Sequence, residues 1–256
     1  MAMHRQAAAL AHDVAAAFGL LTRLPVPVDG ARAAARGARG AWAFPLVGAV
    51  VGLLTAGVAA GALAIGLGPV AAAIAAVGVG IMLTGALHED GLADTADGFW
   101  GGWTSERRLG IMKDSRIGAY GVIALVLAVS MKVALVADLI TAGQRVAALV
   151  AAACGARAAM VAVWAALPPA RPDGLARSMG RPGAGTAGVA ILVALPGLAL
   201  LSPLAMLWAG SAAALGAGLV ARSAARRIGG QTGDVLGAVQ QVSEIAILAA
   251  VAATLP

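Results

Sequence analysis

Long apolar stretches, separated by short polar segments, dominate the pattern of the chain. A transmembrane helix needs about 20 predominantly apolar residues. Stretches near this length recur at Trp42–Ile65, Pro69–Leu87, Ile117–Ile140, Arg145–Leu167, Ala184–Leu201, Pro203–Val220 and Val235–Leu255. We therefore predict an all-α polytopic membrane protein with about seven transmembrane helices. The expected range is about five to eight, because short stretches rich in Gly and Ala can merge or re-enter.

The segment before the first stretch has a different pattern. Ala7–Leu21 is apolar but is interrupted by His12 and Asp13, which predicts an amphipathic helix at the membrane interface rather than a further span. Asp29–Gly40 is rich in Arg, Ala and Gly, and we expect a mobile linker there. Because no other long linker and no internal repeat occur, we expect residues 1–256 to form one integral-membrane domain.

Composition and charge support this topology. Of the 256 residues, 61% are hydrophobic and 12% charged, whereas a soluble domain carries about 25% charged residues. With a cytoplasmic N-terminus, the segments 1–41, 88–116, 168–183 and 221–234 face the cytoplasm. These contain all but three of the 18 Lys and Arg residues, as basic loops should. The net charge of +6 then suits an anionic lipid surface, and no aromatic–basic platform for nucleic acid is evident.

Small residues in the first apolar stretch predict close helix packing. Gly48 and Gly52, and likewise Gly57 and Gly61, have the spacing that allows helices to approach in membranes. The contact can lie within one chain or between two copies, so a homo-oligomer remains open. Cys154 is the one cysteine, which excludes an internal disulfide, and we interpret it as a small packing residue.

The strongest chemical signal is the acidic segment His88–Gly98. Four of the 12 acidic residues lie within it. In a helix, Asp90, Asp94 and Asp97 share one face at i, i+4 and i+7, while Glu89 points elsewhere. Three such carboxylates repel one another unless a hard cation binds, and Mg²⁺ accepts a few carboxylates together with water and substrate phosphates. The alternative is a solvated loop, which does not require this register. We leave His88 and Glu89 outside the metal set.

Basic and polar residues follow the acidic segment. Arg107, Lys113, Ser115 and Arg116 lie before the third apolar stretch, where cations beside a metal site suit phosphate oxygens. They could instead only anchor the loop on the cytoplasmic side. That alternative explains their sign but not the Ser, Asp and Gly residues among them.

A Gly-rich segment precedes the last apolar stretch on the same predicted side. Gly230, Thr232 and Gly233 would present backbone N–H groups at a helix N-terminus, where phosphate binds favourably. Together, the three segments predict a metal-dependent enzyme that acts on a phosphate-bearing substrate.

These motifs resemble the cobalamin synthase family, the adenosylcobinamide-GDP ribazoletransferases. The resemblance rests on H-E-D-G-L-A-D-T-A-D-G from His88 and R-R-L-G-I-M-K-D-S-R-I-G-A-Y-G from Arg107. L-T-R-L-P-V-P from Leu21, F-P-L-V-G from Phe44 and G-G-Q-T-G-D-V-L-G-A from Gly229 extend it along nearly the whole chain. Glu89 and Gly110 are less typical of the family.

The resemblance implies a reaction. A ribose hydroxyl of α-ribazole, or of its 5′-phosphate, attacks adenosylcobinamide-GDP, GMP leaves, and the nucleotide loop of the corrinoid is completed. It also implies Mg²⁺ and the cytoplasmic membrane of a prokaryote. For this reaction we expect Asp90, Asp94 and Asp97 to hold Mg²⁺, with Asp234 as a further ligand and Asp114 as a candidate base.

Three other activities share part of the pattern. Asp90-x3-Asp94 is similar to the aspartate motif of membrane prenyltransferases, and Asp90-Gly91-x2-Asp94 is faintly similar to that of CDP-alcohol phosphotransferases. A prenyltransferase should carry a second aspartate-rich motif, whereas Asp173 and Asp234 are single acids. A metal or organic-cation transporter is the third alternative, and it should have charges along a transmembrane path.

Overall fold

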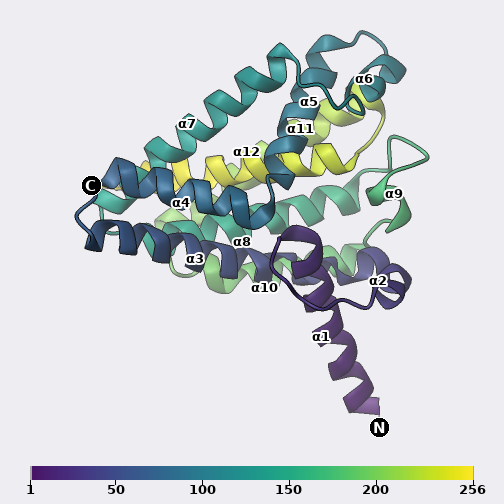
Figure 1. Cartoon of the computed structure of the whole chain (residues 1–256). Helices are drawn as coiled ribbons and strands as arrows, with labels where there is room; N and C mark the ends of the chain where they lie inside the picture. The colour runs from purple at the N-terminus through teal and green to yellow at the C-terminus, as the bar shows by residue number, and fades with distance from the viewer. Residues whose placement is uncertain (1, 256) are drawn as a thin grey trace.

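The computed structural model describes the backbone of residues 2–255 and the side chains of this range except 2–6, 175 and 176. Within that part the chain is helical and contains no strand, only an isolated bridge between Pro169 and Gln231. The helices of the bundle are α3 (Phe44–Ala64), α4 (Pro69–Thr84), α7 (Ala119–Thr141), α8 (Arg145–Ala166), α10 (Ala184–Leu198), α11 (Pro203–Ile228) and α12 (Gly233–Ala252) (Figure 1). The other helices are α1 (Ala2–Leu21), α2 (Gly30–Arg36), η1 (Gly37–Ala43), α5 (Leu87–Gly101), α6 (Ser105–Ile111) and α9 (Leu175–Ser178).

Helix α8 lies at the centre of the bundle and packs against α3, α10, α11 and α12. Because most side chains of α8 are small, these helices can approach it closely. Nearly every residue from Ala148 to Met160 is buried as a result. Gly52 of α3 is required by the same packing, because a Cβ there would lie 2.7 Å from the Cα of Val150. The pair Gly48 and Gly52 therefore serves packing within one chain. Cys154 is buried beside Gly197, which agrees with a packing role.

Among the residues that the structure describes, five helical segments are long and apolar enough to cross a membrane on their own: Gly30–Ala64, Ala119–Thr141, Arg145–Ala166, Pro203–Ile228 and Gly233–Ala252. A sixth is possible if the bent pair α4 and α5 counts as one span. The all-α polytopic fold is thus confirmed. The predicted count of about seven exceeds the number that meets this test, because α4 has 16 residues and α10 has 15.

The bundle has two distinct ends. One buried cluster joins Ala62, Ile140, Leu201 and Val251, so the turns α3–α4, α7–α8 and α10–α11 lie together near the C-terminus. A second cluster joins Leu21, Phe44, Trp164 and Leu236 at the opposite end. There α1, α2 and α9 lie around the ends of the bundle helices, whereas α5 and α6 rise to one side of it (Figure 1). All segments singled out for their chemistry belong to this second end.

Three predictions about local structure need correction. The linker expected at Asp29–Gly40 contains α2 and part of η1, since Arg36 donates to the buried carboxylate of Asp13 (Nε–Oδ1 2.8 Å) and ties the segment to α1. The segment 88–116, expected only as a cytoplasmic connection between spans beyond the helix at His88–Gly98, contains a second helix, α6. Helix α11, which precedes the Gly-rich segment, was expected to end at Val220 but continues to Ile228. It ends there because Gly229 adopts a left-handed conformation.

Candidate active site

A sharp bend places the acidic segment. Gly85 (φ 63°) ends α4 in the left-handed region, and Ala86 follows with φ 58°. Because two successive residues adopt this conformation, α5 leaves α4 at an angle of 87°. Helix α5 therefore lies across the bundle rather than along it, and we treat it as outside the membrane-spanning segments. The helix predicted for His88–Gly98 is confirmed.

Two glycines let α5 cross α12 at close range. A Cβ on Gly91 would lie 2.7 Å from the carbonyl oxygen of Asp234 and 3.1 Å from the Cα of Gly237. A Cβ on Gly237 would lie 3.3 Å from the carbonyl oxygen of His88. Backbone thus meets backbone at this crossing, where no side chain fits. As a result, Asp90 on α5 and Asp234 on α12 come to the same place.

Asp90 lies between two cavities. The first, which we call the loop recess, has a volume of about 420 Å³ and lies between α5 and the segment after α6. Its lining includes Asp90, Asp94, Lys113, Asp114, Ser115 and Leu125. The second, which we call the apolar recess, has a volume of about 240 Å³. Its lining includes Leu20, Phe44, Leu87, Met160, Trp164 and Leu236, together with Asp90, Arg171 and Asp234.

The acids around Asp94 disfavour its charged form. Burial raises the pKa of Asp94, and the neighbouring charges of Asp90, Asp234 and Asp97 raise it further, to about 7, against a smaller opposing effect of Arg171. A cation would relieve this repulsion. Among the residues that the structure describes, no group of three or more His, Cys, Asp or Glu side chains could by itself hold a metal ion. Mg²⁺ does not need such a cage, because water and substrate phosphates complete its shell.

Asp97 has different neighbours from Asp90 and Asp94. It is buried, and its carboxylate accepts hydrogen bonds from the N–H groups of Gly118 (2.7 Å) and Gly121 (2.9 Å) at the start of α7. The two glycines are required, since a Cβ on either would collide with that carboxylate. Asp97 thus shares a helix with the other acids but does not line either recess. Its visible role is to join α5 to α7.

Two of the basic residues that follow the acidic segment form ion pairs with acidic side chains. Lys113 pairs with Asp173 (2.5 Å) and Arg116 with Asp114 (2.8 Å), all exposed. The hydrogen bonds from Arg116 lower the pKa of Asp114 to about 2. Because efficient bases have a pKa near the working pH, this disfavours Asp114 as the base. Lys113 and Ser115 line the loop recess, whereas Arg107 and Arg116 are exposed outside its lining.

The Gly-rich segment divides into structural and accessible residues. Gly230 is buried against the carbonyl of Pro168. The hydroxyl of Thr232 accepts a hydrogen bond from the N–H of Val235 (3.2 Å) and thereby caps α12. Gly233 is exposed and, like Asp234, lines the apolar recess. Of the residues predicted to bind phosphate here, Gly233 is therefore the one open to a ligand.

Arg171 is a site residue that the sequence pattern did not reveal. Its Nη2 lies 3.3 Å from Oδ2 of Asp234, and its Nη1 is buried without a hydrogen-bond partner in the structure. It lines the apolar recess. No spacing or motif singles it out, and the only available signal was its place in the segment 168–183, on the side predicted to be cytoplasmic.

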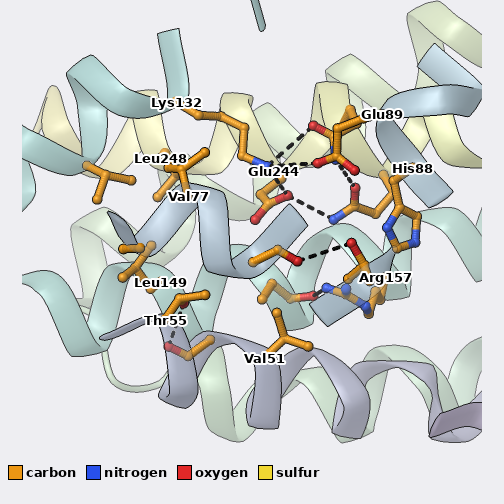
Figure 2. Close-up of a pocket in the computed structure, with 18 residues that line it drawn as sticks. Val51, Thr55, Val77, His88, Glu89, Lys132, Leu149, Arg157, Glu244 and Leu248 are labelled. Atoms are coloured by element: carbon orange, nitrogen blue, oxygen red, sulfur yellow. Dashed lines mark hydrogen bonds and ion pairs between the residues drawn. The ribbon is translucent and has the colours of Figure 1, made fainter. Parts of the chain in front are cut away.

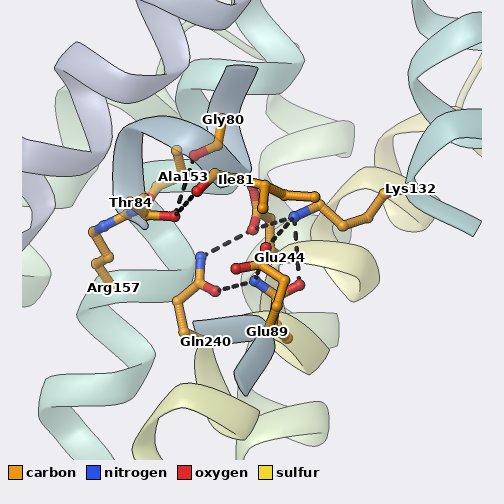
Figure 3. A network of polar contacts seen from close by, with 10 residues as sticks. Gly80, Ile81, Thr84, Glu89, Lys132, Ala153, Arg157, Gln240 and Glu244 are labelled. Carbon is orange, nitrogen blue, oxygen red and sulfur yellow. Dashed lines mark hydrogen bonds and ion pairs between the residues drawn. The ribbon is translucent and has the colours of Figure 1, made fainter. Parts of the chain in front are cut away.

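A buried polar network supports the first turn of α5 (Figure 2). Lys132 of α7 lies 3.1 Å from Glu244 of α12 and 3.7 Å from Glu89 of α5. Gln241 donates to Glu89 (2.9 Å) and Gln240 donates to Glu244 (2.9 Å), as Figure 3 shows from another side. A buried charge is costly unless it is paired. The network thus holds Glu89, the neighbour of Asp90, against α7 and α12.

The same residues surround a small cavity of about 40 Å³, which Arg157 and His88 also line. The Nε of Arg157 and Nε2 of His88 are buried and have no hydrogen-bond partner in the part of the chain that the structure describes. A space of this size has room for water but not for a substrate. The charges that lie within spans are therefore mostly explained by pairing and not by a transport path.

Comparisons with known proteins agree with the family resemblance. The family model described as "Cobalamin-5-phosphate synthase" matches residues 13–252. Proteins named adenosylcobinamide-GDP ribazoletransferase match over most of both chains. That of Azorhizobium caulinodans is 48% identical over 246 residues (92% of this chain, 93% of the relative), and that of Bradyrhizobium diazoefficiens 45% over 249 residues (94% and 93%). No solved structure matches. The chain therefore belongs to the cobalamin-5-phosphate synthase family.

Proposed function

We propose that this protein transfers the cobinamide-phosphate group of adenosylcobinamide-GDP to α-ribazole or its 5′-phosphate and releases GMP. The observation that carries the proposal is the position of Asp90 between two recesses. A reaction that joins two substrates needs two binding spaces that meet at the reacting atoms. The names of the relatives support the chemistry, and the two recesses support a separate binding space for each substrate.

The place where the two recesses meet, at Asp90, suits a phosphoryl transfer. Asp90, Asp94 and Asp234 offer oxygen ligands for Mg²⁺, which when bound would neutralise charge on the pyrophosphate. Lys113 and Ser115, on the wall of the loop recess, are placed to contact phosphate oxygens. The ribose hydroxyl forms a new P–O bond to the phosphorus nearer the cobinamide and loses its proton to solvent, while the bond from that phosphorus to the GMP phosphate oxygen breaks and GMP leaves. Asp97 then acts indirectly, by fixing α5 relative to α7.

We also propose a role for Arg171, which lines the apolar recess, in binding the acceptor. Its buried Nη1 lacks a partner and its Nη2 contacts Asp234. A guanidinium with free N–H groups binds phosphate well. We therefore assign Arg171 to the 5′-phosphate when the acceptor carries one.

We further propose that the site faces the cytoplasm. The end of the bundle that holds α5, α6 and the Gly-rich segment also holds most Lys and Arg residues, and basic segments remain cytoplasmic. The enzyme would then lie in the inner membrane with a cytoplasmic N-terminus, and nucleotide substrates would reach it from the cytosol.

The rival activities have less support. A transporter would need charges along a path, but Lys132 is paired with Glu89 and Glu244 beside a cavity of only about 40 Å³. The prenyl- and CDP-alcohol transferases would share the metal chemistry, but the matched family and relatives carry cobalamin names.

Release of GMP tests the proposal. The detergent-purified protein is incubated with adenosylcobinamide-GDP, α-ribazole and Mg²⁺, and GMP is measured together with the corrinoid product. We expect both products in equal amounts, and neither product when α-ribazole or Mg²⁺ is omitted. A folded preparation that forms no GMP, or that forms it without α-ribazole, would contradict the proposal.

A further inference from the structure

The apolar recess has a wall suited to a flat, uncharged group. Phe44 of α3 and Trp164 of α8 stack with ring centroids 6.1 Å apart at 28°, and both rings are buried. The indole N–H of Trp164 donates to the carbonyl of Gly180 (3.1 Å), which fixes the ring. Met160 and Leu236 complete this wall. The wall is therefore largely apolar and aromatic.

The recess also has charged lining residues. Asp90, Arg171 and Asp234 line it together with the apolar residues, and Asp90 is exposed to solvent. A ligand that fits must consequently have an apolar end and a polar end. Its polar end would lie beside the carboxylates to which we assign Mg²⁺.

Size separates the two substrates. The volume of about 240 Å³ is close to the lower limit of small-molecule pockets, about 300 Å³. That space suits a heterocyclic base with part of its sugar, but not a corrin macrocycle with its side chains. The corrinoid is then left to the loop recess, whose volume of about 420 Å³ is larger.

We infer that the apolar recess binds the aromatic base of the ribazole acceptor, with the ribose toward Asp90 and Asp234. The inference rests on the proposed function and extends it by assigning one recess to one substrate. The base packs against the wall formed by Phe44, Met160 and Trp164, and so the recess selects the base by shape. The ribose hydroxyl then lies at the junction of the recesses, where the pyrophosphate must also be.

Filling each recess with a larger side chain tests the assignment. Leu87→Trp and Leu20→Trp add bulk to the apolar recess from two different helices, Leu87 being 41% exposed and thus tolerant of change. Leu125→Trp adds the same bulk to the loop recess. Leu53→Trp, on the exposed face of α3, is the matched control outside both recesses. The KM of each substrate is measured for all four variants.

We expect Leu87→Trp and Leu20→Trp to raise the KM for α-ribazole about tenfold or more and to leave that for adenosylcobinamide-GDP within about twofold. Leu125→Trp should do the reverse, and Leu53→Trp should change neither. The inference is overturned if both apolar-recess variants keep the wild-type KM for α-ribazole, or if they raise the KM for the corrinoid instead.

A binding measurement separates this inference from the proposed function. Equilibrium dialysis with α-ribazole needs no turnover, so it reports on the recess even if the wild type releases no GMP. Binding to the wild type that is lost in Leu87→Trp supports the recess assignment, whatever the reaction. No binding to the wild type, or equal binding to Leu87→Trp, overturns it.

Discussion

Gly91 of α5 and Gly237 of α12 lie backbone to backbone, so closely that a Cβ on Gly91 would be 3.1 Å from the Cα of Gly237. This contact brings Asp90 to Asp234, which are distant in sequence. The acidic helix and the Gly-rich segment thus form one site because two glycines permit a close crossing.

Gly91→Ala should therefore weaken both fold and activity. Its Cβ would collide with backbone atoms of Asp234, which cannot move like a flexible side chain, and overpacking of this kind costs about 1–3 kcal/mol. We expect a lower melting temperature and a reduced rate of GMP release. Gly110→Ala in α6, where a Cβ meets nothing within 4 Å, is the control and should retain wild-type values. Equal behaviour of the two variants would refute the close crossing.

Asp97→Asn should act on stability rather than on metal binding. The amide keeps one acceptor oxygen, so one of the N–H groups of Gly118 and Gly121 loses its partner, at a cost of about 1–3 kcal/mol. We expect a lower melting temperature with the Mg²⁺ concentration for half-maximal activity unchanged. A large rise in that concentration at an unchanged melting temperature would make Asp97 a metal ligand instead.

Lys132→Met should destabilise the protein by about 3–5 kcal/mol, because it leaves Glu89 and Glu244 buried without their cation. Combining it with Glu89→Gln and Glu244→Gln removes the unpaired charges and should recover much of the loss. Lys113→Met breaks an exposed ion pair, which should cost about 0–1 kcal/mol. Chemical unfolding in detergent would compare the three variants. A triple variant no more stable than Lys132→Met would contradict the pairing argument.

Arg171→Gln should distinguish the two acceptors. If the guanidinium contacts the 5′-phosphate, the KM for α-ribazole 5′-phosphate rises about tenfold or more, since a bond to a charged group is worth about 1.5–3 kcal/mol, whereas that for α-ribazole changes less. Arg177→Gln, which lies on the same segment but outside the apolar recess, serves as the control. Parallel changes for both acceptors would leave Arg171 with a role only in holding Asp234.

The sequence predicted local features well and long-range partners poorly. The helix that carries Asp90, Asp94 and Asp97 follows from their spacing, which depends only on helical periodicity. The bend at Gly85 and Ala86 does not, because the apolar stretch around it is continuous and Ala86 is not a residue that usually adopts positive φ.

Contacts that only the tertiary structure creates could not be predicted from the sequence either. Asp97 shares a face with Asp90, yet only the position of α7 decides that its oxygens accept the N–H groups of Gly118 and Gly121. Arg171 belongs to no motif, and its contact with Asp234 spans a long stretch of sequence. Such roles depend on which helices meet, which periodicity does not specify.

The most direct test of the central claim is the Mg²⁺ dependence of GMP release by Asp94→Asn, which preserves size and removes the charge at the junction. Asp138→Asn, which removes an exposed carboxylate of α7 outside both recesses, is the matched control. We predict that Asp94→Asn lowers GMP release at least about a hundredfold, equivalent to about 3 kcal/mol, or needs far more Mg²⁺, while Asp138→Asn keeps the wild-type Mg²⁺ dependence. A folded Asp94→Asn enzyme with near wild-type rate and ordinary Mg²⁺ dependence would contradict the account.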